Sequence, residues 1–218
     1  MSGQSEASQG EVEELKAENA RLKSALRAAE DELSAQRAAV RELTVRDELT
    51  GLFNQRELRR LLNEEVSRAL RYKHPLSLLL VDVDGLETIN AEHGKTAGDD
   101  VLRSVAAVLR SNLRPVDRSA RYEGAALAVL LPDTFANDGV QVAERLRGLV
   151  GGAASRAKSV ASHRASVTIS VGVAGIHESE KTPDELLFAA TTALREAKDR
   201  GRDAVVAFVD LKLPTARA

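Results

Sequence analysis

The chain contains no cysteine and no tryptophan, and aromatic residues make up only 3% of its 218 positions. The absence of cysteine excludes disulfides and thiolate metal sites. The shortage of aromatic rings argues against the stacking platforms that bind single-stranded nucleic acid. The formal net charge of -2 gives no general attraction to nucleic acid or to an anionic membrane, so any anion site must be local. Aliphatic side chains must therefore build the core.

Signals for targeting and for several enzyme classes are also missing. The polar N-terminus has no apolar run of the signal-peptide type, and we expect a cytoplasmic protein that neither inserts into membranes nor binds nucleic acid. The four histidines are scattered, and the sequence has no zinc signature, P-loop or nucleophile elbow. With 43% hydrophobic and 29% charged residues, the length suits one domain with a core plus an extension.

The extension is a heptad repeat near the N-terminus. The a positions are Val12, Asn19, Leu26, Leu33 and Val40, and the d positions are Leu15, Leu22, Ala29, Gln36 and Leu43. Opposite charges at g to e′ spacing, as in Glu18 and Lys23, and the asparagine at an a position favour two parallel strands. We expect a homodimeric parallel coiled coil over residues 11–45, preceded by a disordered segment 1–10. A solvated single helix or a tether stays as the alternative, because Ala29 and Gln36 weaken the seam.

From Asp47 onward the pattern becomes mixed α/β. Helices are expected over Arg56–Tyr72, Ala97–Leu109, Asp138–Leu149 and Pro183–Arg200. Strands are expected over Leu76–Val83, Ala120–Tyr122, Leu127–Leu131, Ser166–Ala174 and Ala204–Val209. The stretch Gly151–Arg164, rich in alanine, serine and glycine, is typical of a loop or a weak helix. We place the domain at 46–212 and a tail at 213–218.

Four blocks in this region occur in a recognisable order. Residues 47–54 read DELTGLFN, residues 82–90 read DVDGLETIN, residues 121–132 read RYEGAALAVLLP and residues 193–202 read ALREAKDRGR. Together they resemble the GGDEF domain of bacterial diguanylate cyclases over about residues 46–210. The resemblance implies an α/β (α+β) fold of the nucleotidyl-cyclase and polymerase-palm type. A central, mainly antiparallel five-stranded sheet would be flanked by helices.

The third block departs from the family signature. Its five positions read Glu123, Gly124, Ala125, Ala126 and Leu127. In the family, carboxylates hold the metal ions that let two GTP molecules join across a dimer. One carboxylate corresponds to Asp82, but the hairpin's acidic positions are Ala125 and Ala126, which can neither ligate a metal nor take a proton. We therefore predict a degenerate domain with no useful cyclase activity, no bound metal and no cofactor.

Other positions of the family's nucleotide site are kept. By resemblance, Asn90 and Asp99 correspond to the guanine-reading pair, while Lys198 and Arg202 correspond to triphosphate contacts. With Asp82 they define a vestigial nucleotide site. The alternative is that Asp82 is an ordinary acidic residue at the end of a strand.

An Arg-x-x-Asp sequence, Arg114 to Asp117, lies just upstream of the hairpin. In the family this sequence at this spacing is the inhibitory site for the product cyclic di-GMP, and Arg145 falls where a second arginine often contributes. A guanidinium offers planar donors to phosphate or to guanine O6 and N7, and a carboxylate accepts from guanine N1 and N2. A loop salt bridge or a vestigial site is the alternative, since a second Arg-x-x-Asp starts at Arg200.

The sequence thus favours a catalytically inactive GGDEF protein that binds cyclic di-GMP through Arg114, Asp117 and Arg145. It would dimerise through residues 11–45 and signal to an unidentified protein partner. Two other classes stay open. One is a dimeric scaffold that needs no nucleotide. The other is a residual cyclase that uses Asp84 or Glu123 beside Asp82, or a regulator that binds GTP at the old active site.

Overall fold

A computed structural model describes residues 16, 18–33, 36, 44–154, 167–176 and 182–210. The expected disordered segment 1–10, the tail 213–218, the part of the expected loop from 155 to 164 and much of the heptad repeat lie outside these residues. The chain divides into two units between Val45 and Arg46. Within the described ranges, no helix is both long enough and apolar enough to cross a membrane.

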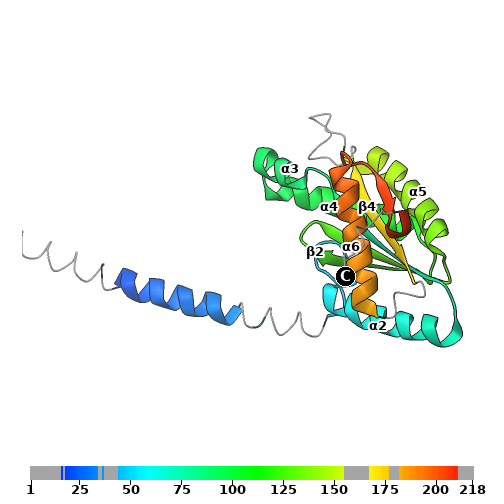
Figure 1. The fold of residues 1–218 in the computed structure, drawn as a ribbon. Coiled ribbons are helices and arrows are strands. Elements are labelled where there is room, and N and C mark those ends of the chain that lie inside the picture. The colour runs from blue at the N-terminus through cyan, green and yellow to red at the C-terminus, as the bar shows by residue number, and fades with distance from the viewer. Residues whose placement is uncertain are drawn as a thin grey trace, which may run out of the picture. The chain divides into compact units, whose positions relative to one another are not determined.

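The first unit is helical over residues 18–33, drawn in blue in Figure 1, which confirms an N-terminal helix. Three leucines at a and d positions of the heptad repeat, Leu22, Leu26 and Leu33, are 64%, 59% and 47% exposed. Their exposure leaves an apolar stripe along this helix. Pairing with a second copy stays a prediction.

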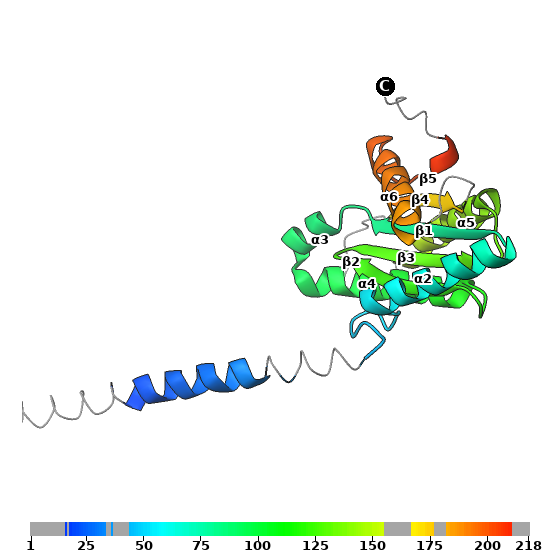
Figure 2. The same cartoon turned by 60° about the horizontal axis from the view of Figure 1, so that its bottom comes forward.

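The second unit has a five-stranded sheet. Its elements are α2 (Gln55–Tyr72), β1 (Leu76–Val83), α3 (Leu86–His93), α4 (Lys95–Asn112), β2 (Arg118–Glu123), β3 (Ala126–Pro132), α5 (Ala136–Ala154), β4 (Ile169–Gly175), α6 (Pro183–Asp199), β5 (Val205–Ala207) and the short 3-10 helix η2 (Phe208–Asp210). The strand order is β2-β3-β1-β4-β5, which Figure 2 shows across the sheet. Only the β4–β5 pair is parallel. The predicted fold class is confirmed.

Alternation along β1 separates two apolar layers. Leu79 and Val81 belong to the core cluster that α4 and α5 cover, whereas Leu78 and Leu80 belong to the cluster that α2 and α6 cover. Successive side chains of a strand point to opposite faces, so both faces of this central strand are buried. By the same alternation, Asp82 lies on the face of α2 and α6, at the end of β1.

The ends of two helices follow from their sequences. Asn54, the last residue of the 47–54 block, caps α2 by accepting from the backbone N–H of Glu57. Thr182 and Glu185 form a capping box at α6, with Pro183 in the first position. These caps explain why both helices begin within one residue of the predicted start.

One helix was missed, and several predicted boundaries differ from the structure by two residues or more. The α3 helix was missed because its short sequence buries only Leu86 and Ile89, and it begins after Gly85 in the left-handed region at φ +69°. The helix α5 continues to Ala154, past the predicted loop start at Gly151. The last strand covers only Val205–Ala207, and η2 replaces the rest of the predicted strand Ala204–Val209.

Gly172 is required where α6 packs on β4. A Cβ at Gly172 would lie 2.2 Å from both the Ala190 carbonyl oxygen and the Leu194 nitrogen. We expect Gly172→Ala to lower the free energy of unfolding by about 1–3 kcal/mol, because the clash is with backbone that cannot rotate away. Urea denaturation measures this.

The control for this substitution is Gly148→Ala on α5. A Cβ there meets nothing within 4 Å, so alanine should leave stability unchanged or raise it by up to about 1 kcal/mol. Equal unfolding midpoints for the two variants would contradict the close packing of α6 on β4.

Candidate functional site

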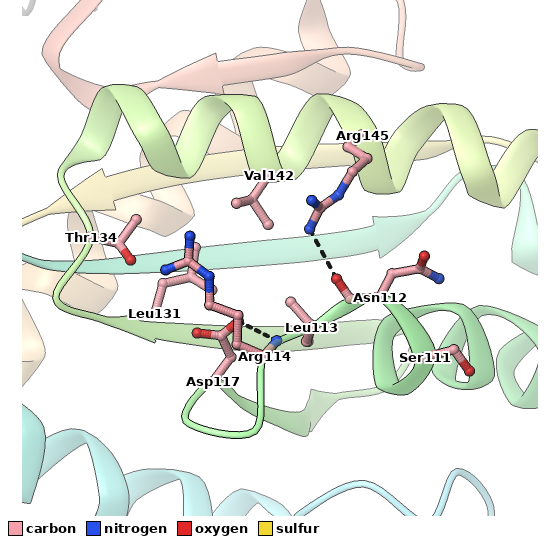
Figure 3. Close-up of a pocket in the computed structure, with 9 residues that line it drawn as sticks. All are labelled: Ser111, Asn112, Leu113, Arg114, Asp117, Leu131, Thr134, Val142 and Arg145. Atoms are coloured by element: carbon pink, nitrogen blue, oxygen red, sulfur yellow. Dashed lines mark hydrogen bonds between the residues drawn. The ribbon is translucent and has the colours of Figure 1, made fainter.

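A cavity of about 280 Å³ lies between the end of α4, the turn before β2, and α5 (Figure 3). Its lining comprises Ser111, Asn112, Leu113, Arg114, Asp117, Leu131, Thr134, Val142 and Arg145. The three residues that the sequence singled out for cyclic di-GMP, Arg114, Asp117 and Arg145, are therefore brought to one cavity, although Arg145 comes from another helix.

The turn over residues 114–117 is closed by its own hydrogen bonds. The Arg114 N–H donates to Asp117 Oδ2 at 2.8 Å, and the Asp117 N–H donates to the Arg114 carbonyl at 3.0 Å. The Arg118 guanidinium donates to the Pro115 carbonyl at 2.7 Å. These contacts hold the Asp117 carboxylate at the cavity.

The other carboxylate oxygen of this residue, Asp117 Oδ1, is buried and has no hydrogen-bond partner among the residues that the structure describes. A buried acceptor that is not paired costs about 1–3 kcal/mol, so an incoming donor would recover stability here. The cavity therefore offers a fixed acceptor for an N–H group.

Two guanidinium groups flank this acceptor. Arg145 Nη2 donates to the carbonyl of Asn112 at 2.9 Å, which orients its side chain over the end of α4. Figure 3 shows the Arg114 guanidinium directed toward Thr134. No hydrogen bond or ion pair joins this guanidinium to another described residue. Both groups can donate to an anion or to a purine edge.

The floor between the two arginines is apolar. Leu113, Leu131 and Val142 line it, and the first and third pack partly buried against the core covered by α4 and α5. An apolar floor with a few converging polar groups is the usual composition of a small-molecule site. The arrangement suits a flat, polar, anionic ligand.

At the vestigial nucleotide site, in contrast, the carboxylate is already paired with a cation. In the sheet register, Asp82 on β1 stands opposite Ala126 on β3 and opposite Ser170 on β4. Lys198 Nζ lies 2.9 Å from Asp82 Oδ1, and the Asp82 side chain is only 18% exposed. The charge partner of Asp82 is thus an ammonium from α6, which sequence reasoning assigned to phosphate.

The two carboxylates considered as substitute metal ligands are already hydrogen-bonded. The Asp84 carboxylate accepts from Thr168 Oγ1 at 2.8 Å, from Ser170 Oγ at 2.7 Å and from the Asp203 N–H at 3.1 Å. Glu123 accepts from Gln55 Nε2 at 3.0 Å. Within the described ranges, histidine, aspartate and glutamate side chains form no group of three that could hold a metal ion.

The remaining vestigial residues come from α3, from α4 and from the turn after α6. Asn90 on α3 packs against Gly98 on α4, since a Cβ at Gly98 would lie 2.0 Å from Asn90 Oδ1. That oxygen is buried without a hydrogen-bond partner, and Asp99 follows Gly98 directly. Arg202 lies in the turn after α6 with φ +66°. Its backbone N–H donates to the Ala197 carbonyl.

The Arg121 side chain stabilises the hairpin between β2 and β3. Its guanidinium donates to the Gly124 carbonyl at 3.0 Å and lies 3.3 Å from the Asp47 carboxylate. Burial, followed by the neighbouring negative charge of Glu123, raises the pKa of the Tyr122 phenol. The β2–β3 hairpin is therefore linked to the 47–54 segment by this contact.

Sequence reasoning missed the other six lining residues of the cavity. One signal was available, because Val142 lies three positions before Arg145 and faces the same side of a helix. No local sequence pattern marks Thr134 as a lining residue. It follows β3, and it lies at the cavity only because β3 runs antiparallel to its neighbours in the folded sheet.

Comparison with known proteins agrees with this architecture. The profile of the family described as "Diguanylate cyclase, GGDEF domain" matches residues 44–204, and the chain belongs to this family. Response regulator PleD of Caulobacter vibrioides is 41% identical over 167 residues, which cover 76% of this chain and 36% of PleD. The chain thus spans about a third of the length of that relative.

Two solved structures are also similar. The coiled coil and GGDEF domain of DgcB from Caulobacter crescentus, in complex with c-di-GMP, superposes with a TM-score of 0.69 at 27% identity, covering 87% of this chain and 98% of DgcB. Diguanylate cyclase SiaD from Pseudomonas aeruginosa, in complex with its activator SiaC, has a TM-score of 0.65 at 33% identity, covering 94% and 79%. The chain is a GGDEF-domain protein related to diguanylate cyclases.

The Asp82–Lys198 pair should contribute to stability. In a double-mutant cycle with Asp82→Asn and Lys198→Met, we expect a coupling energy of about 0.5–1 kcal/mol, because the pair is partly screened by solvent. Urea denaturation of the four proteins measures it. The exposed Glu196–Arg200 pair on the same helix should give a smaller value. A coupling energy of zero for Asp82 and Lys198 would contradict the contact.

Proposed function

We propose that this protein is a receptor for cyclic di-GMP that lacks diguanylate cyclase activity. One observation supports it above others. Arg114, Asp117 and Arg145 surround one cavity, whereas the residue opposite Asp82 is Ala126. The groups that suit a guanine nucleotide are thus together, and the hairpin carboxylates that would hold a metal beside Asp82 are replaced.

The ligand fits the chemistry of the cavity. Guanine presents the O6 and N7 acceptors to a guanidinium and the N1 and N2 donors to a carboxylate. Among the described residues, Asp117 Oδ1 has no donor, and no side chain engages the Arg114 guanidinium. The relative DgcB was solved in complex with this ligand.

Catalysis would need a second carboxylate beside Asp82. Alternation places Ala126 and Asp82 on the same face at adjacent positions, so a carboxylate at 126 would share a metal with Asp82. Loss of one preorganised electrostatic group costs about 2.7–4 kcal/mol of transition-state stabilisation. Magnesium-dependent formation of cyclic di-GMP from GTP, abolished by Asp82→Ala, would show instead that a residual cyclase exists.

Signalling would run through dimers and a partner protein. The stripe of Leu22, Leu26 and Leu33 supports the proposed coiled coil over residues 11–45, joined to a domain at 46–212. SiaD, a relative, was solved with an activator protein. We expect the partner to be a protein that binds this chain only when cyclic di-GMP is present.

A nucleotide-independent scaffold is the second candidate. The 114–117 turn is closed by internal hydrogen bonds, as a purely structural turn would be. The calorimetry and the light scattering that follow distinguish the candidates, because a scaffold keeps its dimer and binds no cyclic di-GMP.

Removing the Arg114 guanidinium should weaken ligand binding. We expect Arg114→Ala to bind cyclic di-GMP at least about tenfold more weakly in calorimetry, since a charge-assisted hydrogen bond contributes about 1.5–3 kcal/mol. The matched control is Arg200→Ala, which removes the arginine of the second Arg-x-x-Asp sequence. Arg200 pairs with Glu196 on the surface, so its loss should leave the affinity unchanged. Equal affinities for wild type and Arg114→Ala would rule out this cavity.

Breaking the apolar stripe should dissociate the dimer. Leu26→Asp places a charge at an a position, and we expect a monomer by light scattering at concentrations where the wild type is dimeric. Arg27→Asp introduces the same side chain at the neighbouring b position and should leave the dimer intact. A dimer that survives Leu26→Asp would place the self-association elsewhere.

A further inference from the structure

We propose that Phe135 forms a second, open part of the cyclic di-GMP site, where its ring stacks on the guanine that the cavity leaves outside. This inference rests on the proposed function. It adds a contact that no arginine or aspartate of the cavity supplies.

The size of the cavity motivates it. About 280 Å³ is slightly below the range of about 300–1,000 Å³ over which pockets enclose most of a drug-sized ligand. Cyclic di-GMP carries two purines, two riboses and two phosphates. The cavity therefore encloses only part of such a ligand, and the other guanine must lie over the rim.

Phe135 is placed at that rim by the chain. It directly follows Thr134 and lies seven residues before Val142, and both of these line the cavity. Its carbonyl accepts from the Gly139 N–H at 2.9 Å, so Phe135 already follows the helical repeat of α5. A spacing of seven returns to nearly the same side of a helix, which is the side of the cavity. Figure 3 shows the Arg114 guanidinium at this end, beside Thr134.

The ring is exposed, but its backbone is rigid. Phe135 is 67% exposed, whereas the preceding Thr134 is 6% exposed. The Thr134 hydroxyl donates to the Pro132 carbonyl at 2.9 Å, and the Thr134 carbonyl accepts from Ser77 Oγ at 2.9 Å. A large apolar ring held in water on a fixed support loses little entropy when it stacks on a ligand.

The chemistry of the rim favours a nucleotide over an apolar side chain of another protein. The ring stands at the end of a cavity that holds two guanidinium groups, and covering these with an apolar surface would remove their hydration without replacing it. A guanine joined to phosphates supplies a flat π-face for Phe135 and anionic oxygens for the arginines.

Two pairs of variants test the stacking. Phe135→Ala should bind cyclic di-GMP about five- to a hundredfold more weakly in calorimetry, the range expected for loss of one base-stacking contact. The matched control is Phe188→Ala, because Phe188 is equally exposed at 68% and belongs to α6, which contributes none of the residues that line the cavity. Its affinity should equal that of the wild type.

Because the chain has no tryptophan, Phe135→Trp introduces a single fluorescent reporter. We expect cyclic di-GMP to quench its emission at the affinity measured by calorimetry, and to leave Phe188→Trp unchanged. Binding that is unaltered in Phe135→Ala, or a reporter at 135 that does not respond to bound ligand, would overturn the inference alone. A wild type that binds no cyclic di-GMP would overturn both this inference and the proposed function.

Discussion

The antiparallel pairing of β1 between β3 and β4 is the constraint on which the rest depends. Its register sets Asp82 opposite Ala126 on one side and Ser170 on the other. A shift by one residue would turn every side chain of β1 to the other face, so the buried leucines on both faces lock this register. At this register Asp82 faces an alanine on β3, and its carboxylate pairs with Lys198.

The cavity does not depend on that part of the sheet. Its polar groups come from the turn before β2 and from α5, while the β2–β3 hairpin follows the opposite end of β2. The edge strand β2 is six residues long, and it separates the 114–117 turn before its first residue from the hairpin after its last residue. The residues at positions 125 and 126 therefore do not determine where Arg114, Asp117 and Arg145 lie.

Much of the fold could be predicted from local sequence. The apolar run of β1 and the cap and proline of α6 gave nearly correct bounds, because each depends on neighbours in the chain. The α3 helix could not be predicted, since it buries only two apolar residues. The short length of β5 could not be predicted either, because pairing with β4, rather than the residues of β5 itself, sets that length.

The sequence by itself determined what each candidate side chain can do. Alanine at positions 125 and 126 cannot ligate a metal, and an Arg-x-x-Asp turn offers donors and an acceptor, whatever the fold. Only the tertiary structure decided which groups meet. The unpaired Asp117 Oδ1, the Lys198 contact to Asp82 and the exposed ring of Phe135 each depend on residues distant in the chain. Burial and charge pairing are properties of the packed chain, and local sequence does not contain them.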